Sequence, residues 1–216
     1  MQKERSVYLL RMETFIMYLF PPMLIIFNYL SFQFFVRVSG NRQGYLSGMI
    51  FYWLVWCIIP FLLFVSKGNR KLLLKIKRIN WWQAILLVVP VLLAILYGPF
   101  KSRIGISSPL IISLSFIYAT ANAFSEELLW RGLYFDHHQG NFFYAAIIPA
   151  FWFGIWHYAP LSVQTSMAGN FYFILSAMGL GLCWATVTWF TRSVFWSIIS
   201  HILVDFSGLG ALYFFK

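Results

Sequence analysis

Apolar residues occur in long runs along almost the whole chain, separated by short breaks that carry charged residues, glycine or proline. Each run is close to the roughly 20 apolar residues that an α-helix needs to cross a bilayer. The pattern therefore predicts an all-α fold, a polytopic transmembrane helical bundle of about seven spans. The predicted spans cover residues 14–36, 45–66, 81–98, 109–136, 142–158, 171–190 and 193–215.

The composition excludes a water-soluble enzyme, because 61% of the residues are hydrophobic and only 10% are charged. Such a chain leaves almost nothing for a domain outside the membrane. We divide it into an N-terminal membrane region, residues 1–108, with about three spans and a basic loop, and a helical core, residues 109–216. The first apolar run is too long for a cleaved signal peptide, and we expect it to be retained as a span.

The net charge of +10 matters less than where the basic residues lie. The basic residues of one loop are Lys67, Arg70, Lys71, Lys75, Lys77 and Arg78. Basic loops beside apolar runs are typical of the cytoplasmic side of a membrane and of contact with anionic lipid, so we expect the lipid bilayer as partner and no nucleic acid. Ten basic residues against five on the two predicted sides place the N-terminus in the cytoplasm. Residues 67–80 fit either an amphipathic helix on the membrane or a plain loop.

Three of the six acidic residues lie within apolar surroundings, namely Glu126, Glu127 and Asp205. An ionised side chain costs roughly 2.5 to 3.5 kcal/mol or more at the centre of a bilayer, so such residues indicate function. Two histidines, His157 and His201, share this part of the chain. No comparable group occurs in the first three predicted spans, and the concentration of these groups favours a functional site over packing.

Helix geometry predicts that these groups converge. With a tight turn at residues 137–141, Glu126 and His157 lie almost equally far from the turn and are expected to face each other. Two pairs are four residues apart and share a helix face: Glu127 with Arg131, for which we expect an ion pair, and His201 with Asp205.

Two further patterns favour structural interpretations. Small residues recur every four positions at Ala177, Gly181 and Ala185, a spacing that lets helices approach closely. His137 and His138 lie at the predicted turn, where we expect them to be solvated.

Three short motifs occur in order along the C-terminal half. They are Glu-Glu-x-x-x-Arg at Glu126, Glu127 and Arg131, Phe-x-x-x-His at Phe153 and His157, and His-x-x-x-Asp at His201 and Asp205. In these motifs the chain resembles the CPBP intramembrane proteases, which comprise CAAX-type prenyl endopeptidases and bacteriocin-processing or immunity proteins. The last position of the third motif is Asn or Asp in this family. The resemblance covers residues 109–210 and does not extend to the first 108.

The resemblance implies a role for each motif residue. Glu126 resembles a general base that activates water, His157 would hold that water, Glu127, Arg131 and Phe153 would support the site, and His201 and Asp205 would stabilise the oxyanion. These roles suit peptide hydrolysis without a nucleophilic side chain, which needs a base and hydrogen-bond donors at the developing charge. Asp205 has two possible roles, either as a protonated donor or as an ionised group that orients His201.

A metal is the less favoured alternative. Glu126, His157 and His201 together would form a zinc set, but the compact His-x-x-x-His pair of helical zinc proteases is absent. We therefore expect no cofactor, with Zn²⁺ as the alternative.

The function that fits best is an intramembrane endopeptidase that acts on a membrane-associated peptide or lipidated protein. A CAAX-type protein, a peptide pheromone and a bacteriocin leader are all compatible substrates. The alternative is a non-proteolytic protein, for bacteriocin self-immunity or as a membrane scaffold. The short basic chain is typical of a prokaryotic plasma membrane protein.

Overall fold

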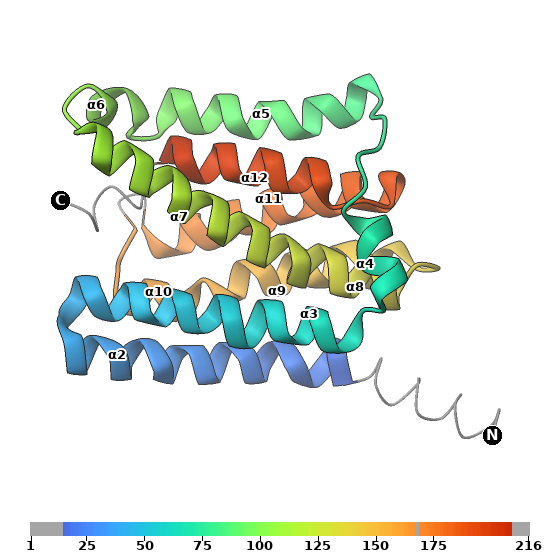
Figure 1. Cartoon of the computed structure of the whole chain (residues 1–216), viewed down its shortest axis with the longest axis horizontal. Helices are drawn as coiled ribbons and strands as arrows, with labels where there is room; N and C mark the ends of the chain where they lie inside the picture. Colours follow the sequence, from blue (N-terminus) through green and yellow to red (C-terminus); the bar gives the residue numbers. More distant parts are fainter. Residues whose placement is uncertain (1–14, 167–168, 209–216) are drawn as a thin grey trace.

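The computed structural model describes residues 15–166 and 169–208, and within these residues the chain forms helices and no strand (Figure 1). The all-α prediction is therefore confirmed. The helices of the first half are η1 (Phe15–Leu19), α2 (Phe20–Phe51), η2 (Tyr52–Ile58), α3 (Ile59–Phe64), α4 (Lys67–Leu73), α5 (Trp81–Tyr97) and α6 (Phe100–Ile104). Those of the second half are α7 (Pro109–Glu127), η3 (Leu128–Leu133), α8 (Tyr134–His137), η4 (Phe143–Ile147), α9 (Ile148–Trp156), α10 (Tyr158–Leu161), α11 (Asn170–Thr191) and α12 (Phe195–Gly208).

The prediction of seven membrane spans is not confirmed. Within the described residues, two helical stretches are long and apolar enough to cross a membrane, Phe20–Phe64 and Asn170–Thr191, and Trp81–Tyr97 is apolar but shorter. The outer ends of the first and last predicted spans, at residue 14 and at residues 209–215, lie outside the described residues, as do the N-terminal basic residues and Lys216.

The longest stretch folds back on itself at Gly40, which has φ 78° and ψ 168°, a backbone conformation that glycine adopts without strain. The two halves then pack closely, because a Cβ atom on Gly44 would overlap the backbone of Val36. This reversal of the chain lies within the predicted break between the first two apolar runs. It brings η2 back along the bundle, where Tyr52 and Trp53 face the C-terminal half.

The loop at 67–80, the turn at 137–141 and the loop at 191–192, which an odd number of spans would put on one side of the membrane, lie at one end of the bundle (Figure 1). The backbone N–H of Val194 donates to Leu73 O at 2.8 Å, and the Trp196 indole donates to Lys77 O at 2.7 Å. The Asn69 amide donates to Asp136 at 2.6 Å. These bonds join the basic loop to the turn before α12 and to α8. Which side of a membrane this end faces stays a prediction.

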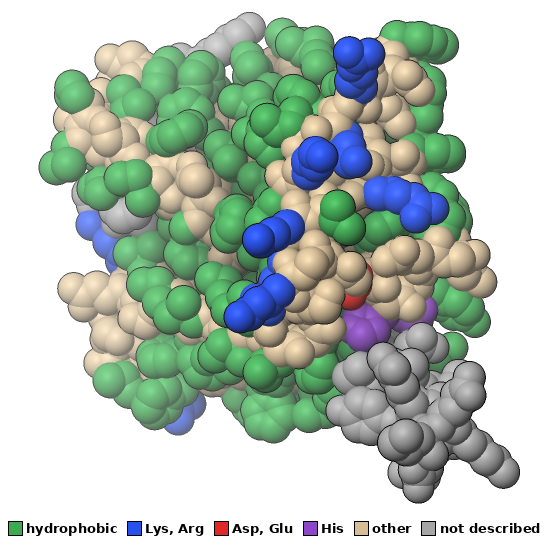
Figure 2. Space-filling view, turned by 45° about the vertical axis from the view of Figure 1, so that its right-hand side comes forward, with side chains coloured by type: hydrophobic (Ala, Val, Ile, Leu, Met, Phe, Trp, Pro, Cys, Tyr) green, Lys and Arg blue, Asp and Glu red, His purple; other side chains and the backbone are tan. Residues whose placement is uncertain are grey.

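The segment 67–80 combines both structures considered for it. Its first half is the helix α4, which begins after Ser66, whose hydroxyl accepts from the N–H of Asn69 at 3.3 Å. Its second half is a loop. Of the leucines in the whole segment, only Leu73, at the end of α4, is buried. Figure 2 shows the Lys and Arg side chains gathered over this part of the surface.

The turn between α8 and η4 is short, as predicted, but its histidines are only partly exposed. His138 packs against Tyr144, with ring centroids 5.9 Å apart. Burial lowers the pKa of His138 from its ordinary value of 6.5 to about 4. The expectation that these histidines are solvated is therefore met only in part, because both are partly exposed and His138 packs against Tyr144.

Candidate active site

Glu126 and Glu127 lie in the last turn of α7, and both are almost completely buried. Neighbouring residues on a helix point about 100° apart, so the two carboxylates have largely different partners. Glu127 turns towards Arg131, and Glu126 turns towards η2 and Tyr52. Two buried carboxylates in one helical turn need nearby positive charge or hydrogen-bond donors to remain stable.

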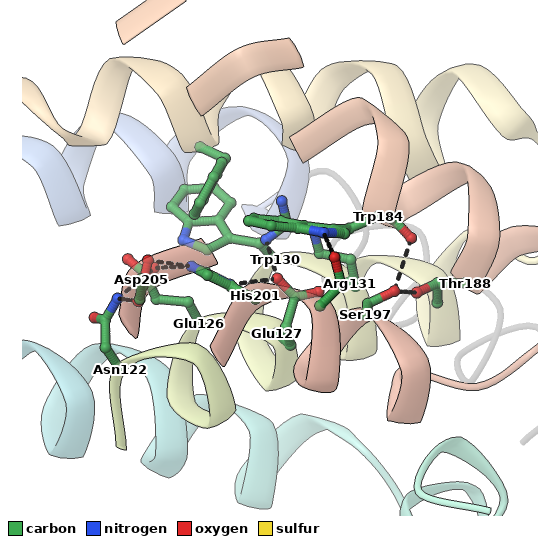
Figure 3. A network of polar contacts seen from close by, with 12 residues as sticks. Asn122, Glu126, Glu127, Trp130, Arg131, Trp184, Thr188, Ser197, His201 and Asp205 are labelled. Atoms are coloured by element: carbon green, nitrogen blue, oxygen red, sulfur yellow. Dashed lines mark hydrogen bonds and ion pairs between the residues drawn. The ribbon is translucent and has the colours of Figure 1, made fainter. Parts of the chain in front are cut away.

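Arg131 supplies the first of these charges. Its Nη1 lies 2.8 Å from Glu127 Oε1, which confirms the predicted ion pair (Figure 3). The guanidinium lies over the ring of Phe153, 4.2 Å from its centroid, and 5.2 Å from that of Trp184. Arg131 is thus held in a buried position between the rings of Phe153 and Trp184.

His201 joins both glutamates to Asp205. Its Nδ1 lies 2.9 Å from Glu127 Oε1, and its Nε2 lies 3.5 Å from Glu126 Oε2 and 3.4 Å from Asp205 Oδ1 (Figure 3). Its ring stacks on Trp184, with centroids 4.1 Å apart. A carboxylate oxygen can only accept, so both ring nitrogens are in the position of donors, which fits the imidazolium form.

Asp205 lies where this network is exposed to the surroundings, since its side chain is 24% exposed and that of His201 is 3% exposed. Its second oxygen, Oδ2, accepts a hydrogen bond from the Asn122 amide at 2.8 Å. Both carboxylate oxygens of Asp205 therefore face donors. Asp205 is therefore the most exposed of the charged residues in this network.

Sequence reasoning missed four residues of the site. Asn122 Nδ2 also lies 3.2 Å from Glu126 Oε2, and the Trp53 indole donates to Asn122 Oδ1 at 2.9 Å. Tyr52 donates to Glu126 Oε1 at 3.2 Å and accepts from the Trp130 indole at 2.9 Å. The position of Asn122, four residues before Glu126 in an apolar run, was a signal for the first of them.

His157 stands apart from this network. Its Nδ1 lies 2.6 Å from the carbonyl oxygen of Phe153, so Nδ1 carries the proton and Nε2 offers a lone pair. Its ring touches Phe153, whose ring centroid also lies 6.0 Å from that of His201. Within the described residues no hydrogen bond or ion pair joins His157 to Glu126, although we expected the two to face each other. The His157 Nδ1 instead bonds back to Phe153 on its own helix.

The arrangement does not assemble the alternative zinc set of Glu126, His157 and His201. In the part of the chain that the structure describes, no group of three His, Cys, Asp or Glu residues could hold a metal ion. Both nitrogens of His201 face carboxylates, so neither directs a lone pair at a metal.

Comparison with known protein families shows which family this chain belongs to. A family model described as type II CAAX prenyl endopeptidase Rce1-like matches residues 80–207, more than half of the chain. The match contains every residue predicted for the site and begins before the predicted boundary at 108. Searches of curated proteins and of solved structures found no match. The chain therefore belongs to the Rce1-like type II CAAX prenyl endopeptidases, a family of membrane-integral proteases.

Proposed function

We propose that the protein cleaves a peptide bond with a water molecule that Glu126 activates. The observation that carries this proposal is the position of His201, whose Nε2 lies 3.5 Å from Glu126 Oε2 in a buried site. A base and a cationic donor then lie side by side, as water-mediated peptide hydrolysis requires.

In the proposed mechanism Glu126 takes a proton from water, and the water oxygen forms a bond to the carbonyl carbon of the substrate. His157 Nε2 accepts a hydrogen bond from the other hydrogen of the water, which stays on the water oxygen. His201 donates to the oxygen on which negative charge develops. Glu126 then returns its proton to the leaving amine as the C–N bond breaks, so the enzyme ends as it began.

Glu127 and Arg131 act on this reaction through His201. Glu127 Oε1 is shared between Arg131 and His201, which fixes the orientation of the imidazole.

The balance of charge in the site also supports Glu126 as the base. Three carboxyl groups face one guanidinium and one imidazolium, so the site carries one negative charge in excess when all three are ionised, and Glu126 can accept a proton without leaving a net positive charge.

We propose a membrane-associated peptide or lipidated protein as substrate. The family name favours a prenylated CAAX protein, and a peptide pheromone or bacteriocin leader remains a separate candidate. Two peptides distinguish these classes: a farnesylated CAAX peptide and the same peptide without the lipid. Each carries a fluorophore–quencher pair that reports cleavage. Cleavage of the farnesylated form alone supports a prenylated substrate, and equal cleavage of both contradicts it.

The test of the mechanism is Glu126→Gln, which keeps the shape of the side chain and removes its basicity. We expect cleavage to fall by at least about 100-fold, the usual scale of general-base catalysis. Asp136→Asn is the matched control, because it makes the same chemical change at the loop end of the bundle. An active Glu126→Gln enzyme refutes the assignment of Glu126 as the base.

The proposal also excludes an essential metal. Prolonged chelation in detergent should leave cleavage of the same peptide unchanged. Loss of activity that zinc restores would favour the hydrolytic-metal alternative.

A further inference from the structure

Tyr52 lies on η2, outside the residues that the family model matches, yet its hydroxyl reaches the proposed base. The hydroxyl oxygen lies 3.2 Å from Glu126 Oε1, and the side chain is fully buried, with 0% exposed. The N-terminal region therefore contributes a group to a site whose sequence motifs all lie in the C-terminal half.

The direction of this hydrogen bond follows from its neighbour Trp130. The Trp130 indole Nε1 lies 2.9 Å from the same hydroxyl, and an indole nitrogen can only donate. Tyr52 accepts from Trp130 and keeps its own hydrogen for the carboxylate of Glu126. The chain of bonds thus runs from Trp130 through Tyr52 to Glu126.

The ring of Tyr52 is also held in place. It stacks on Trp156, with centroids 3.7 Å apart and planes 16° apart. Trp156 directly precedes His157, and the rings of these two residues are 5.2 Å apart. Tyr52 therefore lies between the helix of the proposed base and the helix of the proposed water-binding histidine.

This arrangement leaves the two oxygens of Glu126 unequal. Tyr52 occupies Oε1, and Oε2 faces His201 Nε2 and the Asn122 amide. Without the Tyr52 bond the carboxylate is held through Oε2 alone, and small misplacements of a reacting group cost large factors in rate. We propose that Tyr52 is a positioning residue that holds the Glu126 carboxylate with Oε2 towards the reacting centre. This inference rests on the proposed role of Glu126 as the base.

The test is Tyr52→Phe in the full-length protein, assayed with the farnesylated CAAX peptide. We expect kcat to fall about 10- to 100-fold, because a misplacement of about 1 Å in a reacting group can cost about 100-fold in rate. KM should not change, because the hydroxyl contacts the base and not the substrate. Tyr134→Phe is the matched control. Tyr134 is equally buried, and its hydroxyl donates at 3.1 Å to the carbonyl oxygen of Ile16, away from Glu126.

Three results would overturn the inference: a wild-type kcat in Tyr52→Phe, an equal loss in Tyr134→Phe, or a rise in KM at constant kcat. If Tyr52→Phe fails to accumulate in membranes, Trp130→Phe tests the same chain of bonds and should also lower kcat, and an unchanged kcat there would overturn the inference. A wild-type protein that cleaves none of the peptides contradicts the proposed function. An active Tyr52→Phe beside an inactive Glu126→Gln contradicts only the role of Tyr52.

Discussion

The contacts of Asp205 bear on its two possible roles. Its Oδ1 faces His201 Nε2 at 3.4 Å, and its Oδ2 accepts from Asn122 at 2.8 Å. A group with a donor at each oxygen is placed as an acceptor, which favours an ionised Asp205 that orients His201 over a protonated donor.

Asp205→Asn tests this choice. An asparagine at this position would have to turn its NH₂ group towards either His201 or Asn122, both of which are donors. We expect Asp205→Asn to lose about as much activity as Asp205→Ala, on the order of 10- to 100-fold in kcat. Assays of both variants with the farnesylated peptide measure the difference, and an Asp205→Asn enzyme that keeps wild-type activity restores the donor role.

The sequence revealed the charged residues of the site and not their neutral partners. Buried acids and histidines are conspicuous in a chain of this composition, because an ionised side chain costs several kcal/mol inside a membrane unless it is paired. Tyr52 and Trp130 carry no such cost, since their rings suit apolar surroundings and only one polar atom needs a partner. Their contribution depends on how η2 and η3 meet, which no local pattern records.

At the scale of helices, the packing of α11 positions Arg131. The small residues Ala177, Gly181 and Ala185 are buried where α11 packs against α9, as their spacing predicted. A Cβ atom on Gly181 would lie 2.9 Å from the ring of Phe153 and 3.0 Å from Arg131 Nη2. The backbone of α11 thus forms one wall of the pocket that holds the guanidinium.

Gly181→Ala should therefore displace Phe153 and Arg131. Alanine in place of a helical glycine ordinarily stabilises a protein by roughly 0.5 to 1 kcal/mol. Gly179→Ala is the matched control, because a Cβ there has nothing within 4 Å. We expect thermal unfolding in detergent and peptide cleavage to show a loss for Gly181→Ala and no loss for Gly179→Ala. Equal behaviour of the two variants would contradict the proposed wall.

Most helices could be predicted from the runs of apolar residues, and their local form could not. The π-helical segments η2 and η3 carry Tyr52, Trp130 and Arg131. A π turn adds one residue to the helical repeat and so changes which side chains face the site. Apolar runs set the length of a helix but do not resolve one extra residue, so the partners of Glu126 could not be found from periodicity.

At the scale of the whole molecule, the count of membrane crossings depends on how the helices are divided. Phe20–Phe64 qualifies as one long apolar stretch, although it folds back at Gly40. The alternation of loops between two ends of the bundle agrees with the predicted order of spans (Figure 1). Length and hydropathy alone support fewer crossings in the described residues, because helices such as α5, with 17 residues, and α12, with 14, are too short to count.

The helix α5 gives the sharpest test of this topology. Its 17 residues extend about 26 Å at 1.5 Å per residue, slightly less than the roughly 30 Å of a hydrocarbon core. Trp81 and Tyr97 lie at its two ends and are 77% and 85% exposed. Aromatic residues at both ends of an apolar helix are typical of the two membrane interfaces.

We therefore expect α5 to cross the membrane, with Lys75 in the cytoplasm and Ile106 outside, because the basic loop carries the positive charge. Single cysteines at these positions, in a Cys183→Ala background that leaves only the buried Cys57, can be labelled with an impermeant maleimide. Ile106→Cys should react in intact cells, and Lys75→Cys only after lysis. The opposite result would reverse the orientation of the protein. Labelling of both positions from one side would mean that α5 does not cross, since it is the one long helix between them.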